Sequence, residues 1–160
     1  MIDERGAALY ALLRHVRPLV LNSARVVEAL VHDAGWTVGM RAVMEVIDEI
    51  GPTPAPAIAS RLDLPRQGVQ RHINDLLELG HVEAQPNPAH RRSNLIAHTP
   101  RGAEVYARIR ADELRRLDSL AGECSPTDID VAVQVLAALN RDVRDQAARL
   151  TYTRKKRDND

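Results

Sequence analysis

Arginine and glutamine side chains cluster on one side of the segment at residues 66–71. Arginine can pair with two acceptors of guanine, and glutamine with the two edge groups of adenine, so these residue types suit the major groove of DNA. The apolar residues Val69, Ile73 and Leu76 are spaced as on one buried helix face, which turns the polar residues outward. Helix composition alone fits a solvated surface helix equally well. The DNA contacts that it predicts are Arg66, Gln67, Gln70 and Arg71.

A basic, turn-rich segment at residues 86–93 follows the helix and lies between two short strand patterns at 81–85 and 94–98. Arginines at the tip of such a hairpin can reach a phosphate or a narrow minor groove. The position of this hairpin directly after the polar helix favours DNA binding over a merely solvated surface. The contacts predicted here are His90, Arg91 and Arg92.

A first helix pattern at residues 57–64 precedes the polar helix. Pro65 suits the first turn of the second helix, where its missing N–H matters least, and Gly80 suits its end. The connection is a tight turn near Asp63, as in a helix-turn-helix. With the hairpin behind it, the segment is predicted to be a winged helix-turn-helix, in which Arg61 of the first helix also contacts DNA.

Long helical patterns flank this segment on both sides. The N-terminal pattern contains Pro18, which is expected to kink or split it. The last helix is predicted to open at Ser125, a capping residue, with Pro126 in its first turn. The predicted fold is therefore mainly α-helical with a small β-hairpin, a winged helix-turn-helix between helices that carry more apolar surface than such a lobe needs.

The stretch from Trp36 to Tyr106 resembles the multiple-antibiotic-resistance regulator (MarR) family of bacterial transcription factors. Its most specific part is the run at residues 99–102, at a set distance from Leu79 and Gly80. The family usually has aspartate where this chain has His90, so a carboxylate partner of the wing arginine is missing. The resemblance rests on Gly35-Trp36-Thr37, Ile58-Ala59-Ser60-Arg61-Leu62, Val69-Gln70-Arg71, Leu79-Gly80-His81-Val82, Pro88-Ala89-His90-Arg91-Arg92-Ser93 and Thr99-Pro100-Arg101-Gly102.

This resemblance implies a homodimer on double-stranded DNA, most often a repressor, with a pseudo-palindromic operator whose half-sites lie about 34–36 Å apart. It also implies release by a small, often aromatic ligand, for which the candidate residues are Tyr10, Arg14, His15, Trp36 and Met40. The expected organisation is a dimerisation helix at 1–34, a winged lobe at 35–100, dimerisation helices at 101–150 and a flexible tail at 151–160.

Composition agrees with one domain of ordinary size. The chain has 160 residues, of which 44% are apolar, so a core can form without phenylalanine. Its net charge is zero, but DNA affinity depends on where the cations lie. It has no apolar run long enough to span a membrane and no signal-peptide pattern at its start, so a cytoplasmic protein is expected.

Other functional classes find less support in the sequence. No glycine-rich phosphate loop, nucleophile elbow or metal motif is present, so neither an enzyme nor a cofactor or metal site is expected. The single cysteine, Cys124, excludes an intrachain disulfide, and a structural role is expected for it. The remaining alternative is a winged-helix protein-interaction or assembly module without specific DNA binding. Steeply salt-dependent binding to duplex DNA would separate these two hypotheses.

Overall fold

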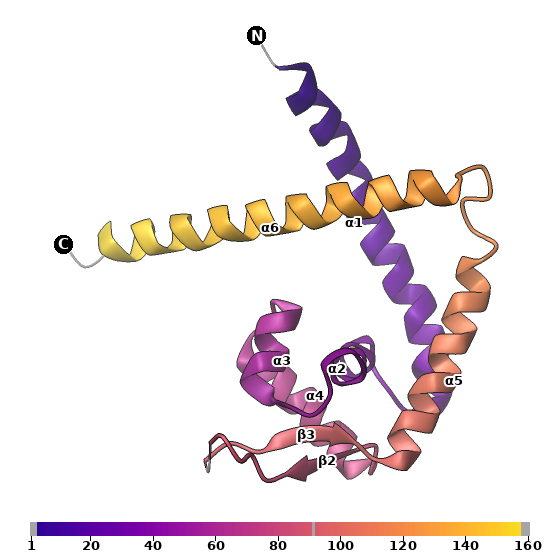
Figure 1. Cartoon of the computed structure of the whole chain (residues 1–160), viewed down its shortest axis with the longest axis vertical. Helices are drawn as coiled ribbons and strands as arrows, with labels where there is room; N and C mark the ends of the chain where they lie inside the picture. Colours follow the sequence, from indigo (N-terminus) through magenta and orange to yellow (C-terminus); the bar gives the residue numbers. More distant parts are fainter. Residues whose placement is uncertain (1–2, 91, 158–160) are drawn as a thin grey trace. The chain divides into compact units, whose positions relative to one another are not determined.

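The computed structural model describes residues 3–90 and 92–157. These fall into two units, with the boundary between Leu117 and Asp118. The first unit holds a long helix, a winged lobe and a second long helix, and the second unit is built on one helix (Figure 1). In chain order the elements are α1 Glu4–Val31, η1 His32–Ala34, α2 Val38–Ile50, β1 Thr53–Pro54, α3 Ala55–Leu62, α4 Arg66–Glu78, β2 Val82–Gln85, β3 Leu95–His98, α5 Pro100–Leu117 and α6 Pro126–Arg157.

The core of the first unit lies inside the winged lobe. The three apolar residues predicted to face inward from α4, Val69, Ile73 and Leu76, are fully buried. They pack in one cluster with the inner face of α2 and with Ile58 of α3. Because α4 is held along its whole inner side, its outer side has a set orientation. The mainly helical fold with a small antiparallel sheet matches the expectation from the sequence.

The ends of α3 and α4 follow from local chemistry. Asp63 ends α3 in the left-handed region, with φ of 53°, which aspartate tolerates better than most residues. Pro65 is the residue just before α4 and not part of its first turn, so the predicted start of the helix shifts by one residue. Gly80 has φ of +68°, as expected for a glycine that ends a helix.

The predicted hairpin is present as β2 and β3, which pair antiparallel from Val82 opposite His98 to Gln85 opposite Leu95. A third strand, β1, pairs with the other edge of β3, so the strand order is β1-β3-β2. This strand was not predicted from the sequence. Two residues are too few for an alternating pattern, and the partner of β1 lies far along the chain.

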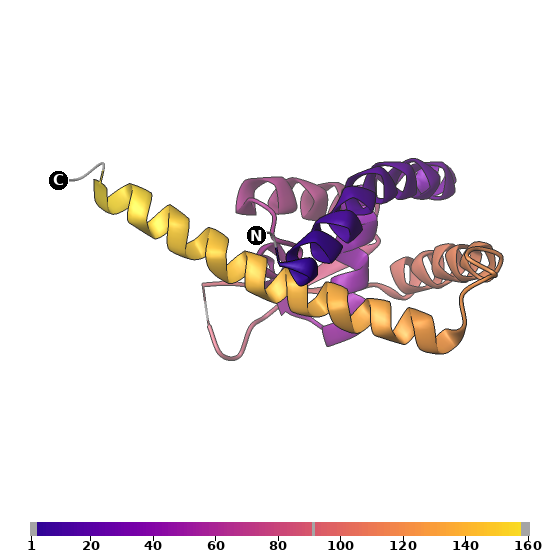
Figure 2. The ribbon, with the colours of Figure 1, turned by 90° about the horizontal axis from the view of Figure 1, so that it is seen from above.

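The long terminal helices differ in part from expectation. Helix α1 passes through Pro18 without a break, so the segment is not split there. A proline removes one backbone hydrogen bond, and the helix keeps the others. Helix α6 begins after Ser125 as predicted and continues to Arg157, although a flexible tail was expected from Thr151 (Figure 2). No helix in the described part of the chain is long and apolar enough to cross a membrane.

Candidate nucleic-acid interface

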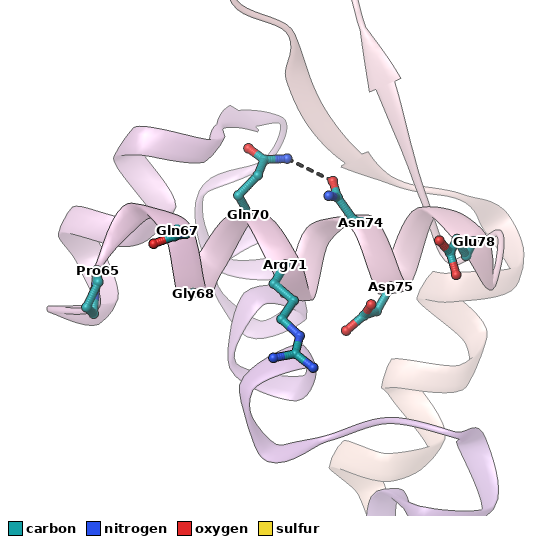
Figure 3. A pocket seen from close by; sticks show the side chains of 8 residues that line it. All are labelled: Pro65, Gln67, Gly68, Gln70, Arg71, Asn74, Asp75 and Glu78. Atoms are coloured by element: carbon teal, nitrogen blue, oxygen red, sulfur yellow. Dashed lines mark hydrogen bonds between the residues drawn. The ribbon is translucent and has the colours of Figure 1, made fainter.

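The outer face of α4 presents the polar residues singled out from the sequence. Arg66, Gln67, Gln70 and Arg71 are all exposed, whereas the residues on the opposite side are buried. An open hollow of about 730 Å³ follows this face (Figure 3). The structure therefore brings four predicted contacts onto one accessible helix surface. The hollow is lined by Pro65, Gln67, Gly68, Gln70, Arg71, Asn74, Asp75 and Glu78.

Charge is unevenly distributed along α4. The cations Arg66 and Arg71 lie in its N-terminal half, and the carboxylates Asp75 and Glu78 lie towards its C-terminus. The N-terminal end of a helix also carries the positive end of the helix dipole. Polyanion approach is thus favoured at the N-terminal half of α4 and opposed at the other end.

Two further residues lie on the same face but were not predicted. Gly68 leaves room on the surface, since an added Cβ would meet nothing within 4 Å. Asn74 accepts a hydrogen bond from Gln70, whose Nε2 lies 3.0 Å from Asn74 Oδ1. The spacing of four residues was a signal that Asn74 shares a side of the helix with Gln70.

Arg61 of α3, the remaining predicted contact in the helix pair, is exposed and bonded within the protein. Its Nη2 lies 3.0 Å from Glu49 Oε2 of α2. Exposed pairs of this kind contribute only about 0–1 kcal/mol. Replacing Glu49 by a DNA phosphate as the partner of Arg61 therefore costs little free energy. The DNA contact of Arg61 stays a prediction.

The loop between β2 and β3 is organised by Asn87. Its Oδ1 accepts from the backbone N–H of Ala89 at 3.0 Å, and its Nδ2 donates to Ser93 Oγ at 3.3 Å. His90 and Arg92 are exposed on this loop, and Arg91 lies outside the described residues. This role of Asn87 was not predicted from the sequence, although asparagine is a common organiser of turns. The hydrogen bonds of Asn87 therefore order the loop that carries His90, at the position where the resembling family usually has aspartate.

The junction between the hairpin and α5 explains the run at residues 99–102. Thr99 Oγ1 donates to the carbonyl oxygen of Gly80 at 2.8 Å and accepts from the backbone N–H of Gly102 at 3.0 Å. A Cβ at Gly102 would come within 1.8 Å of the carbonyl oxygen of His81. Only glycine fits this approach of α5 to the end of α4.

A buried pair lies at the same junction. Trp36 Nε1 donates to His81 Nδ1 at 2.8 Å, which requires a histidine without a proton on that nitrogen. Burial, and secondarily the charge of Arg101, lowers the pKa of His81. Neutral His81 therefore ties the segment before α2 to the segment after α4.

A partly buried ion pair joins α2 to α5. Arg41 Nε donates to Glu113 Oε1 at 2.8 Å and Arg41 Nη2 to Glu113 Oε2 at 2.5 Å, and both side chains are largely shielded from solvent. The hydrogen bonds to Glu113 raise the pKa of Arg41 above its ordinary value, and Glu45 adds to the effect. The winged lobe is thereby fixed to the helix that follows it.

The predicted ligand residues fall into two groups, and none of them lines either of the two described hollows. Trp36 and Met40 are buried in the core of the winged lobe. Tyr10, Arg14 and His15 are exposed on α1. A second hollow, of about 320 Å³, is instead lined by Arg25, Val26, Ala29, Leu30 and Arg116. Its two arginines come from distant parts of the sequence, so spacing did not indicate them.

Known sequences resemble this chain over its winged lobe. A sequence model described as MarR family matches residues 41–93. An uncharacterized protein of Mycobacterium tuberculosis is 36% identical over 108 residues, which cover 68% of this chain and 73% of that protein.

Solved structures are similar over most of the chain. The crystal structure of a MarR family transcription regulator is 31% identical, with a TM-score of 0.77, and the match covers 91% of this chain and 97% of that one. Streptococcus pneumoniae FabT, solved in complex with DNA, has a TM-score of 0.70 at 14% identity, covering 86% of this chain and 98% of that one. The latter likeness concerns the fold alone.

Proposed function

From the premise that this chain belongs to the MarR family of transcription regulators, we propose that it binds duplex DNA sequence-specifically as a cytoplasmic homodimer and represses transcription. The observation that carries the proposal is the exposed N-terminal half of α4, with Arg66, Gln67, Gln70 and Arg71 above a fully buried inner face. Members of the family are regulators and not enzymes. FabT, which shares the fold, was solved in complex with DNA.

In the proposed complex the N-terminal half of α4 enters the major groove, and the loop between β2 and β3 lies on the adjacent backbone. Arg66 and Gln70 supply donors and acceptors to base edges. Arg92 supplies charge to phosphates and carries no sequence information of its own. The carboxylates Asp75 and Glu78 keep the C-terminal half of α4 away from phosphate.

The dimer is supported by the apolar surface of α6. Ile129, Val133, Leu136, Val143 and Leu150 recur at spacings of three, four and seven residues, and all are exposed. A helix with such a stripe buries it against another element in a folded protein. A second copy then sets the two α4 helices on half-sites about one turn of DNA apart.

A small effector completes the proposal. The hollow lined by Arg25, Val26, Ala29, Leu30 and Arg116 offers guanidinium groups beside an apolar wall, which fits a compact organic acid. Such a compound releases DNA if it binds the DNA-free conformation more tightly. Screening aromatic carboxylates for DNA release tests this, and Arg25→Ala should reduce the response to an active compound.

Binding of full-length protein to a pool of duplexes over a range of salt concentrations tests the DNA assignment. Arg92→Ala is expected to weaken binding to all sequences and to lower the salt slope by about one per protomer. Arg66→Ala should relax the preference at particular base pairs. The matched control is Arg108→Ala, which removes an exposed arginine of α5 outside the proposed interface and should leave DNA binding unchanged.

A salt slope near zero for the wild-type protein would contradict the proposal. It would favour the protein-interaction module, because phosphate contacts necessarily release counterions. An Arg92→Ala variant with unchanged affinity for every duplex would contradict the role of the loop alone.

A further inference from the structure

Gln70 and Asn74 form a joined pair of carboxamides on the exposed face of α4. Gln70 Nε2 donates to Asn74 Oδ1 at 3.0 Å, one helical turn further along. Both side chains are exposed and line the hollow on this face (Figure 3). Gln67 lies on the same face, and within residues 3–90 and 92–157 its amide has no hydrogen-bond partner. Of these two glutamines, Gln70 is therefore the one whose amide is hydrogen-bonded to another side chain of α4.

The direction of this hydrogen bond matters for base recognition. A carboxamide has two N–H protons, one beside its carbonyl oxygen and one on the opposite side. Bidentate pairing with adenine uses the carbonyl oxygen, which accepts from N6, and the N–H beside it, which donates to N7. In Figure 3 the oxygen of Gln70 points away from Asn74. The Gln70 oxygen therefore stays free to accept from adenine N6, and Nε2 keeps a second N–H that can donate to N7.

We propose that Asn74 is a positioning residue that holds the Gln70 amide ready for adenine, so that this pair specifies an A·T base pair in each half-site. The inference rests on the proposed DNA binding and names part of its sequence preference. A free glutamine amide rotates and presents its donor and acceptor in either order. In the observed arrangement Asn74 Oδ1 accepts from the nitrogen of Gln70, which favours the order that leaves the Gln70 carbonyl oxygen free for adenine N6.

Substitutions at the two positions separate positioning from general affinity. Asn74→Ala removes the acceptor, whereas Asn74→Asp keeps an oxygen that accepts from Gln70 Nε2 and adds a negative charge. The alanine variant should lose the base preference with little change in binding to phosphates. The aspartate variant should keep the adenine preference while binding every duplex more weakly.

The experiment is selection of bound sites from a randomised duplex library with the full chain at constant salt, followed by sequencing. Wild-type protein is expected to favour adenine about 10- to 100-fold at one symmetric position, the range for a good bidentate contact. Gln70→Ala and Asn74→Ala should both lose this preference at that position. Gln70→Glu should shift it to cytosine, whose N4 donates to a carboxylate. Arg108→Ala, an exposed substitution on α5 outside the proposed interface, is the control and should keep it, and thermal melting checks that each variant is folded.

The outcomes separate the two proposals. If the preference that depends on Gln70 persists in Asn74→Ala, or disappears equally in Asn74→Asp, the positioning role is overturned while DNA binding stands. If no position depends on Gln70 although the library yields a clear site, the adenine assignment is wrong. If wild-type protein selects no sequence at all, the proposed function itself fails.

Discussion

The winged lobe and the terminal helices bury their apolar residues to very different extents. In α2, five residues are buried, from Met40 to Ile47. In α1, which is twice as long, Val31 alone is buried, and α6 has no buried residue up to Leu150. The lobe satisfies its hydrophobic surface within one chain, and the long helices leave theirs open. The lobe has a core of its own, whereas the open apolar surface of the long helices is the surface that the proposed dimer would bury.

The largest expected effect tests the packing of α4 in the core of the winged lobe. Ile73→Ala removes a fully buried side chain from α4 and should lower the free energy of unfolding by about 2–5 kcal/mol, since it loses apolar burial and leaves a cavity. Denaturant unfolding measures this. Leu77→Ala on the exposed side of the same helix is the control and should change stability by about 0.5 kcal/mol or less. Equal losses at the two positions would mean that α4 is not packed as described.

The next effect tests the long helices. Val133→Asp places a carboxylate in the apolar stripe of α6, and loss of an interface anchor of this kind costs about 2 kcal/mol or more, or roughly 30-fold in the Kd of the dimer. Sedimentation over a range of concentrations measures the shift.

Val131→Asp is the matched control for this prediction. Val131 is the same residue type, is similarly exposed, with 54% against 59% for Val133, and lies off the stripe. The Kd of the dimer should change less in Val131→Asp than in Val133→Asp. If both variants remain equally dimeric, α6 does not pair through this stripe.

Protonation of buried histidines should make the stability of the winged lobe depend on pH. Burial lowers the pKa of His81 below its ordinary value near 6.5, so the unfolded chain takes up the proton first as the pH falls. The contribution of neutral His81 to the free energy of unfolding is therefore complete above about pH 6.5 and declines as the pH falls below that value. His98, whose pKa burial also lowers, acts in the same direction.

His81→Gln should flatten this decline in part, because glutamine can accept the hydrogen bond of Trp36 without titrating. Thermal melts between pH 8 and pH 5 measure the slope. An unchanged slope in His81→Gln would show that His81 does not set the acid sensitivity of the lobe.

The smallest expected effect compares two helical glycines. Gly6 in α1 and Gly68 in α4 both have open space where a Cβ would be added, so alanine at either should stabilise the helix by about 0.5–1 kcal/mol. Gly68→Ala should also weaken DNA binding, because the added methyl lies on the face that approaches the bases. Paired melting and DNA titrations measure both quantities. A Gly68→Ala variant that binds DNA like Gly6→Ala would show that this part of α4 stays clear of DNA.

Much of the lobe was predictable because its signals are local. The burial of Val69, Ile73 and Leu76 follows from helical periodicity, and the left-handed end at Gly80 follows from the freedom of glycine. The hairpin at 82–98 follows from two short strand patterns around a turn. The exposed polar face of α4 is the complement of the buried one, so these candidate site residues could also be named.

Contacts between distant segments were not predictable in the same way. Strand β1 has two residues and no pattern of its own, and its pairing depends on β3. The bonds of Trp36 to His81 and of Arg41 to Glu113 join residues that no spacing rule connects. Trp36 and Met40, predicted to line a ligand site, are buried in the core of the lobe, and their contact with a ligand stays a prediction.

By itself the sequence determined the helix-turn-helix, the wing and the polar face of α4, because periodicity, capping and turn residues act within a few positions of one another. Only the tertiary structure decided that Arg61 is paired with Glu49, that glycine is required at Gly102 and that Gln70 is hydrogen-bonded to Asn74. Those outcomes depend on the positions of side-chain atoms in space, and a spacing along the chain does not specify them.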